Sequence, residues 1–303
     1  MTVINFRYHI VSLAAVFVAL AVGAVFGTAA ANGVATDVLS DSISAAHKTN
    51  DQLRQTTEDL QVEASRKDDY INDTAPAVLG GTLDNRRIVV LTTPSGRDHA
   101  QGVIDKLRVA GAAVTGPVDV REAFFDPRNN LGLLELARGS AASSALPGNS
   151  NGAETASALL AAVLLAAPSD VDASAVVSAY ARAGYLTAPE RLDGPADGAV
   201  LVTGAPYVTQ EPTKRNAAIV TMAAQFAMVG STVVAGTGAG DGSALGTVRG
   251  DEALTARIST TDGVAGAQGQ VVTALALVER ITANRGGHYG TADGADALTP
   301  RRP

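Results

Sequence analysis

A long apolar run followed by a long polar segment begins this chain. Residues 10–31 (IVSLAAVFVALAVGAVFGTAAA) contain no charged side chain, and none occurs between Arg7 and Asp37. A helix of this length reaches roughly 33 Å, and the hydrocarbon core of a bilayer is about 30 Å thick. The hydrophobic pattern therefore predicts a transmembrane helix over residues 10–31.

The residues at the ends of this run indicate its orientation in the membrane and whether it is cleaved. Arg7 precedes it and Asp37 follows it, so the positive-inside tendency places residues 1–9 in the cytoplasm and the remainder outside. Ala29–Ala31 offers an A-x-A pattern that a signal peptidase cuts, here before Asn32. Because signal peptides carry only about 7–15 apolar residues, the length of the run favours a retained anchor.

Small residues recur at every fourth position within the apolar run. Gly23 and Gly27 form a GxxxG pattern, which lets two membrane helices approach closely. The spacing predicts a membrane dimerisation face of Ala19, Gly23, Gly27 and Ala31. The alternative is an incidental spacing, because Ala and Gly are frequent throughout the chain.

Residues 34–75 are polar, with apolar side chains at heptad spacing. Asn50 falls at an a position, where two Asn side chains pair in parallel dimers and disfavour other registers. Thr57 and Lys67 interrupt the pattern, so a single solvated stalk helix remains the alternative. Asn72–Pro76 is expected to end the helix, since the residue before a proline resists helical angles. The spacing predicts a coiled-coil stalk, with Ile71 as a late a position and a main seam of Leu39, Ile43, Ala46, Asn50, Leu53 and Leu60.

Residues 79–284 alternate between strands and helices. The first strand, 86–93 (RRIVVLTT), is apolar without alternation, which is typical of a parallel sheet covered on both faces. This order predicts a three-layer α/β domain with a mostly parallel sheet. Residues 285–303 are rich in Gly, Asp and Pro and are expected to be disordered. Further strands are expected at 112–120, 199–204, 231–235 and 256–259, and helices at 98–110, 131–138, 154–167, 171–183, 213–229 and 268–283.

Composition limits the chemistry of this domain. The 303 residues are 46% hydrophobic but only 4% aromatic, so the core is expected to consist of Val, Ala and Leu. The chain has no cysteine, which excludes disulfides and thiolate metal ligands. Its formal net charge of -7 gives no basic footprint for nucleic acid.

Two motifs come closest to a chemical site. The loop Gly236–Gly242 (GTGAGDG) follows the strand at 231–235, and a glycine loop there can hold a phosphate against a helix N-terminus. Residues 243–250 show no amphipathic helix, so ligand binding at this loop is the weaker interpretation. His99 lies near a helix start, but no G-x-S-x-G elbow accompanies it. We therefore expect no enzyme activity, and no catalytic or cofactor-binding residue is predicted.

Metal ligands are sparse in the sequence. Met222 and Met228 are six residues apart on one predicted helix and are expected to fill gaps in the core. Soft copper ions prefer thiolate and thioether ligands, so no metal-binding residue is predicted. The four histidines lie in four different segments, at His9, His47, His99 and His288.

Both ends of the sequence resemble one family. Residues 8–23 (YHIVSLAAVFVALAVG) resemble an opening pattern H-x-V-S-L-A-A-V-F-x-A-L-A-x-G, and Ile258–Asp262 (ISTTD) and His288–Thr291 (HYGT) resemble its C-terminal part. On these segments the chain is similar to the MctB copper transporter family of actinobacteria, including its SteB-like members. The resemblance implies copper efflux through the cell envelope, with copper as the ion handled. For SteB-like members it implies control of cell-wall hydrolysis and cell separation with a membrane partner, SteA.

The residues themselves favour a structural function over a pore. One apolar helix provides no ion pathway, even as a dimer, and an outer-membrane pore needs many alternating strands of about ten residues. We therefore expect a single-pass parallel homodimer in the cell membrane, which presents an extracytoplasmic domain. It would act as an envelope scaffold or regulator that binds a SteA-like protein or a cell-wall hydrolase. A component of copper efflux is the alternative function, and an exported small-ligand-binding domain is a weaker one.

Overall fold

A mostly parallel sheet organises the chain from Lys67 onward. The computed structural model describes residues 6–140, 146–166, 168, 171–189 and 194–301, and the side chains of residues 6–7 and 29–41 lie outside this description. All neighbouring strands run parallel except β3, which pairs antiparallel with β2. Within the described residues, seven strands form one sheet in the order β3-β2-β1-β4-β5-β6-β7. Their bounds are β1 Arg87–Thr92, β2 Ala113–Val120, β3 Leu186–Thr187, β4 Gly198–Val202, β5 Ser231–Ala235, β6 Ile258–Thr261 and β7 His288–Tyr289.

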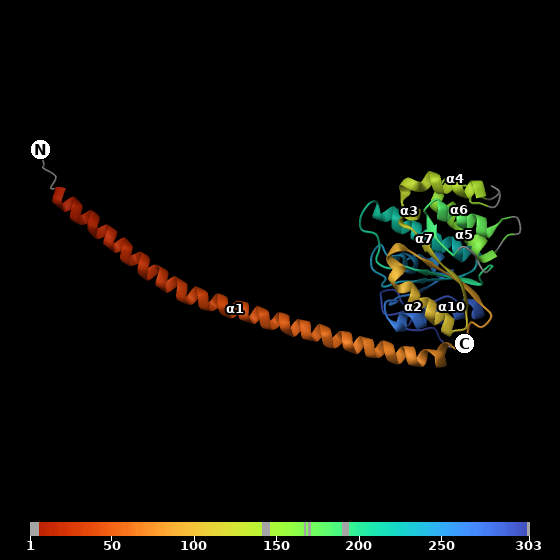
Figure 1. The fold of residues 1–303 in the computed structure, drawn as a ribbon, viewed down its shortest axis with the longest axis horizontal. Coiled ribbons are helices and arrows are strands. Elements are labelled where there is room, and N and C mark those ends of the chain that lie inside the picture. Colours follow the sequence, from red (N-terminus) through yellow and green to blue (C-terminus); the bar gives the residue numbers. More distant parts are fainter. Residues whose placement is uncertain (1–5, 141–145, 167, 169–170, 190–193, 302–303) are drawn as a thin grey trace. The chain divides into compact units, whose positions relative to one another are not determined.

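Helices cover both faces of this sheet (Figure 1). On one face lie α2 (Arg97–Val109) and α10 (Ala267–Ala283). The other face carries α3 Glu122–Phe125, α4 Asn130–Ser140, α5 Gly152–Ala161, α6 Ala173–Arg182 and α7 Pro212–Val229. The predicted three-layer α/β fold with a mostly parallel sheet is confirmed. Shorter elements complete the chain: the 3-10 turns η1 Pro94–Gly96 and η2 Pro127–Asn129, the π-helical turn η4 Ala162–Ala166, and the helices α8 Ala244–Arg249 and α9 Glu252–Thr255.

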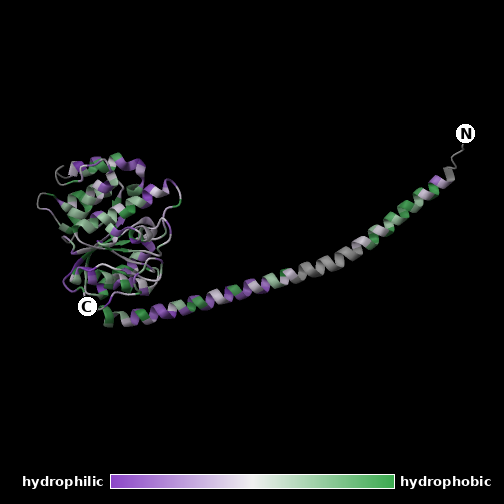
Figure 2. Ribbon diagram, turned by 180° about the vertical axis from the view of Figure 1, so that it is seen from behind, coloured by the Kyte–Doolittle hydropathy of each residue, from purple (hydrophilic) through white to green (hydrophobic). Residues whose placement is uncertain are grey.

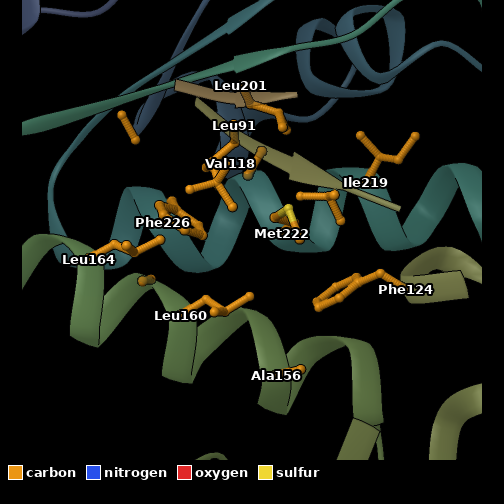
Figure 3. Close-up of a cluster of buried hydrophobic side chains, with 14 of the residues drawn as sticks. Leu91, Val118, Phe124, Ala156, Leu160, Leu164, Leu201, Ile219, Met222 and Phe226 are labelled. Atoms are coloured by element: carbon orange, nitrogen blue, oxygen red, sulfur yellow. The ribbon is translucent and has the colours of Figure 1, made fainter. Parts of the chain in front are cut away.

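Alternate residues of the central strands enter two separate cores. In β1, Val89 and Leu91 pack beneath α3 to α7, whereas Ile88 and Val90 pack toward α2 and α10. Figure 3 shows the first core, in which Met222 and Phe226 of α7 face Leu91, Val118 and Leu201 of the strands. Full burial of each such aliphatic side chain contributes about 1.5–3 kcal/mol. Both cores therefore consist mainly of aliphatic side chains, with few aromatic residues.

The first helix runs past its predicted end. α1 spans 74 residues, Phe6–Leu79, and contains Pro76, so the prediction that Asn72–Pro76 ends the helix is wrong. An interior proline costs about 3 kcal/mol, because it lacks an N–H and crowds the preceding turn. Leu79 is fully buried in the domain core, and the Gly80 N–H donates to the Pro76 carbonyl at 2.9 Å. Burial of the last turn of α1 therefore offsets the cost of Pro76 in the helix.

The end of α1 belongs to the α/β domain. The compact unit that contains the sheet begins at Lys67 and not at Leu79, the predicted boundary. Ile71 was expected in the coiled-coil seam but is half-buried on a helical stripe within this unit. Residues three, four or seven apart share a helix face, and this stripe consists of Asp68, Ile71, Ala75, Val78 and Leu79.

Two side chains of α1 bind the helices on this face of the sheet. The Asp68 carboxylate accepts a hydrogen bond from the Ala267 N–H at 2.9 Å, at the start of α10. The N-cap of α10 is Gly266, which offers no side chain, so Asp68 satisfies an orphan donor and interacts favourably with the helix dipole. The Lys106 ammonium of α2 donates to the Asn72 side-chain oxygen.

Residues 285–301 of the C-terminal segment have a defined structure, which corrects the expectation of disorder for this part of 285–303. Residues 302–303 lie outside the described residues. His288 and Tyr289 are buried and form β7 against β6. The backbone of β6 requires this partner: Thr260 N–H donates to the Gly287 carbonyl, and Asp262 N–H donates to the Tyr289 carbonyl. A Gly- and Asp-rich composition does not reveal such pairing, because two strand residues are too short to produce a pattern.

The other predicted elements are found with small shifts in their ends. The five predicted strands appear as β1, β2, β4, β5 and β6, and the six predicted helices as α2, α4, α5 with η4, α6, α7 and α10. The expectation that residues 243–250 contain no helix is wrong, since α8 occupies Ala244–Arg249. Leu245 and Val248 of α8 are buried, and the Ser243 hydroxyl caps the helix by accepting from Gly246 N–H at 3.0 Å.

Removal of the Asp68 carboxylate tests whether α1 stabilises the domain. We expect Asp68→Ala to lower the free energy of unfolding of the full-length chain by roughly 1 kcal/mol, the usual loss for a helix cap. Urea denaturation in detergent, followed by tyrosine fluorescence, measures it. The control is Asp69→Ala, at an exposed neighbour, with an expected change within about 0.5 kcal/mol. Equal effects from the two variants would contradict the capping role.

Candidate functional site

The carboxyl ends of the parallel strands meet at one edge of the sheet. In α/β proteins, ligands bind at this edge where the strand order reverses, which here is between β1 and β4. The loops beyond these two strands close on each other. A Cβ on Gly204 would lie 2.0 Å from the Ser95 carbonyl oxygen, and one on Gly96 would lie 2.3 Å from the Val202 carbonyl oxygen. The chain's own backbone therefore fills the usual ligand crevice.

Charged side chains gather at the same edge around Arg215. This residue is in the first turn of α7, its side chain is 4% exposed, and it donates to Glu122 Oε1 at 3.1 Å. Its guanidinium carbon lies 4.5 Å from the centroid of the Tyr207 ring, which is a cation–π contact. Among the described residues, neither Arg215 Nε nor the Tyr207 hydroxyl has a hydrogen-bond partner.

Two residues beside Arg215, Asp126 and Tyr207, have pKa values shifted away from neutral pH. Arg128 donates to Asp126 from its side chain and backbone N–H, and these hydrogen bonds lower the pKa of Asp126 to about 2. Burial raises the pKa of Tyr207 to about 12. A general acid or base needs a pKa near the working pH. Asp126 and Tyr207 therefore supply fixed charge and polarity rather than proton transfer.

A hollow of about 420 Å³ opens beside Asp126, between α3, α4, α5 and α7. Phe124, Leu133 and Ala218 give it a mainly apolar lining. Two side-chain amides in the lining form hydrogen bonds within the fold. Asn130 donates to the Ser150 carbonyl and accepts from the Gly152 N–H, and Asn151 caps α5. These two amides of the lining are thus engaged in local structure.

The glycine loop Gly236–Gly242, for which ligand binding was the weaker interpretation, lies at the carboxyl end of β5. Gly236 N–H donates to the Thr261 carbonyl, and the Gly236 carbonyl accepts from Val264 N–H. The loop thereby begins as an extension of the sheet edge. The helix that follows it, α8, has only six residues, and the Gly246 N–H in its first turn is already capped by Ser243.

A second polar cluster is centred on Arg249, beside the carboxyl ends of β6 and β7. The Arg249 and Asp262 side chains are 3% and 4% exposed and form an ion pair at 2.9 Å. Asp262 also accepts from the Thr291 and Ala292 N–H groups at 2.8 and 3.2 Å. Arg249 further donates to the Tyr289 carbonyl at 3.0 Å. The cluster joins α8 and β6 to the residues that follow β7.

His288 extends this cluster. Arg249 Nε donates to the Thr260 hydroxyl at 2.9 Å, and Thr260 Oγ1 lies 2.9 Å from His288 Nδ1. We assign the hydroxyl proton to this second bond, which leaves the imidazole proton on Nε2. Burial lowers the pKa of His288, and the charges of Arg249 and Arg280 act in the same direction, against that of Asp296. The neutral ring is therefore part of the packed strand edge.

Comparison with known proteins assigns the family. The model of the family described as "Copper transport outer membrane protein, MctB" matches residues 3–300. The "Copper transporter MctB" of Mycobacterium tuberculosis and that of Mycobacterium bovis are each 30% identical over 322 residues, covering 98% of this chain and 99% of the relative. The Mycobacterium leprae protein of the same name is 29% identical over 335 residues, with the same coverage. The chain belongs to the MctB family.

The segments that carried the resemblance to the MctB family occupy defined places in the fold. Ile258–Asp262 comprises β6 and the carboxylate that pairs with Arg249, and His288–Thr291 comprises β7 and the N–H group bound by that carboxylate. The sequence matched these two segments but did not show that they are neighbours. Arg249, which joins them, was missed, because a lone Arg in a short loop helix carries no motif.

The candidate membrane segment of this MctB family member is the first part of α1. Tyr8–Thr28 is long and apolar enough to span a bilayer, with a mean hydropathy of 2.6, and it forms the apolar part of α1 in Figure 2. Together with the family, it supports membrane association. Ala19 is exposed, and no atom lies within 4 Å of a Cβ built on Gly23 or Gly27. The Ala31 side chain lies outside the description, and dimerisation through this face stays a prediction.

The predicted seam lies farther along the same helix. Ile43, Leu53 and Leu60 are 49%, 62% and 59% exposed, and Ala46 and Asn50 are exposed as well. The Leu39 side chain lies outside the description. An exposed apolar stripe on one helix is what a coiled-coil half presents before pairing, and the pairing itself stays a prediction.

The residues that could ligate copper are spread over the chain. Met222 is buried in the core as expected, whereas Met228 is 64% exposed on the same helix, so the expectation that it fills a core gap is wrong. His9 and His47 lie on α1, His99 on α2 and His288 in β7. Within the described ranges, no three or more His, Cys, Asp or Glu side chains gather in a way that could hold a metal ion.

The Arg249 cluster is expected to be important for stability. Arg249→Met leaves the buried Asp262 carboxylate without its ion-pair partner, and breaking a buried pair in this way costs about 3–5 kcal/mol. Urea denaturation of the full-length chain measures this loss. The matched control is Arg108→Met, which breaks an exposed pair with Asp105 and is expected to cost at most about 1 kcal/mol. Similar losses of unfolding free energy in both variants would show that the buried Arg249–Asp262 pair stabilises the fold no more than an exposed pair.

Proposed function

We propose that this MctB family member is a membrane-anchored, parallel homodimer that acts as a scaffold or regulator in the cell envelope. The observation that carries the proposal is the composition of α1. One helix contains the apolar span, the exposed heptad stripe and the turns that are buried in the α/β domain. Pairing along this helix would connect two domains to one membrane anchor.

The charge distribution supports an orientation with the domain outside the cytoplasmic membrane. Arg7 precedes the span, and Asp37 follows it, in accord with the positive-inside tendency. The domain would then meet other envelope proteins. A membrane protein of the SteA kind, or a cell-wall hydrolase, is the partner that the resemblance to SteB-like members implies.

Copper handling is the second candidate, favoured by the names of the relatives from the mycobacteria. Copper would then be cargo and not a resident cofactor. The chain has no cysteine and three methionines, which is a poor donor set for a soft ion. The seven described strands are short and covered by helices on both faces. We therefore propose that any function in copper transport proceeds through a partner protein.

Cysteine crosslinking tests the paired stalk. Because the chain has no cysteine, each single substitution introduces one thiol. In a parallel dimer a d position faces its own copy, within the roughly 7 Å between Cα atoms that a disulfide requires. We expect Leu53→Cys to give a covalent dimer on mild oxidation in membranes.

The control for this experiment is Gln55→Cys, two residues along the same helix. That position lies opposite the seam in the predicted register and is exposed, so little covalent dimer is expected from it. Ile43→Cys gives a second seam position, in case one substitution disturbs the pairing. Failure of both seam variants to crosslink, or equal crosslinking at Gln55, would contradict the proposed dimer.

A further inference from the structure

A second hollow, of about 650 Å³, lies at the carboxyl ends of β1 and β2. Ligand sites for small molecules usually measure about 300–1,000 Å³. Its lining residues Pro94 and Arg97 flank Gly96, so the hollow lies beside the crevice that Gly96 and Gly204 close. Its charged side chains come from two parts of the chain: Arg97 begins α2, and Asp119, Arg121 and Glu122 lie around the end of β2 and the start of α3.

The two arginines retain donors toward the hollow. Arg121 uses its Nε to donate to Thr187 Oγ1 at 3.0 Å, and no described residue accepts from its two Nη atoms. Arg97 lies 4.0 Å from Asp119, which is too long for a hydrogen bond. The Arg97 side chain is 57% exposed. Two guanidinium groups therefore line one hollow with most of their N–H groups available.

The acidic residues of the hollow do not cancel this charge. Glu122 is paired with the buried Arg215 at 3.1 Å, so its charge is compensated from below the surface. Asp119 alone then faces Arg97 and Arg121. In a chain with a net charge of -7, this hollow is a local site of positive charge. The first turn of α2, which begins at Arg97, adds favourable dipole potential for an anion.

We propose that this hollow binds a small ligand that carries a carboxylate or a phosphate group, held by Arg97 and Arg121. The planar guanidinium forms paired hydrogen bonds with the oxygens of either group. The site is separate from the glycine loop Gly236–Gly242. It is also independent of the proposed dimer, because every residue in it belongs to one domain.

Thermal unfolding of the full-length chain in detergent tests the site, with inorganic phosphate and citrate as separate probes at matched ionic strength. A specific ligand raises Tm in a saturable manner. We expect such a rise with at least one probe, and the probe that acts identifies the group recognised. Arg97→Gln and Arg121→Gln should each weaken the apparent Kd about tenfold, which corresponds to 1.4 kcal/mol.

Two further variants make the result specific. Arg182→Gln changes an exposed arginine on α6, outside the hollow, and should leave the apparent Kd unchanged. Arg121→Lys keeps the charge without the paired donors and should give an intermediate affinity. Since Arg97 is exposed, its variant keeps the test valid if Arg121→Gln fails to fold. The absence of a saturable shift with both probes, or equal shifts in wild type and Arg97→Gln, would overturn the proposal.

Discussion

Asp68 accepts a hydrogen bond from the first N–H of α10, and Ala75 and Leu79 of the same helix are buried in the domain core. This junction makes the last turns of α1 part of the α/β domain. α10 extends from the junction and packs against β5 and β6. Because a helix end needs a cap and a core needs its apolar neighbours, the domain is incomplete without these turns of α1.

The carboxyl edge of the sheet shows a second constraint. Gly96 and Gly204 let two loops approach until no side chain fits between them, and this close contact fills the crevice in which related architectures bind ligands. Charged residues remain beside it, with Arg215 buried beneath Glu122. Near neutral pH, Asp126 at this edge is a carboxylate and Tyr207 is a neutral phenol. Arg97 and Arg121 lie in the hollow at this edge, where we propose that a small anion binds.

The sequence predicted the regular elements better than their connections. Buried strands such as 86–93 and amphipathic helices such as 213–229 have local patterns, and they were found. Pro76 was misleading, because burial of Leu79 is a tertiary effect that local rules do not contain. β7 was missed for a similar reason: its two residues are ordered by β6 and by Asp262. Arg97 begins α2 and Arg121 follows β2, so only the folded chain brings these two residues of one hollow together.

Two copies of the chain are proposed to share one anchor and one stalk through the exposed faces of α1. The most direct measurement is the polypeptide mass of the full-length protein in detergent micelles, obtained by light scattering with the detergent contribution subtracted. We predict a mass twice that of the 30.6 kDa chain. A mass of one chain at every protein concentration would contradict the dimeric scaffold.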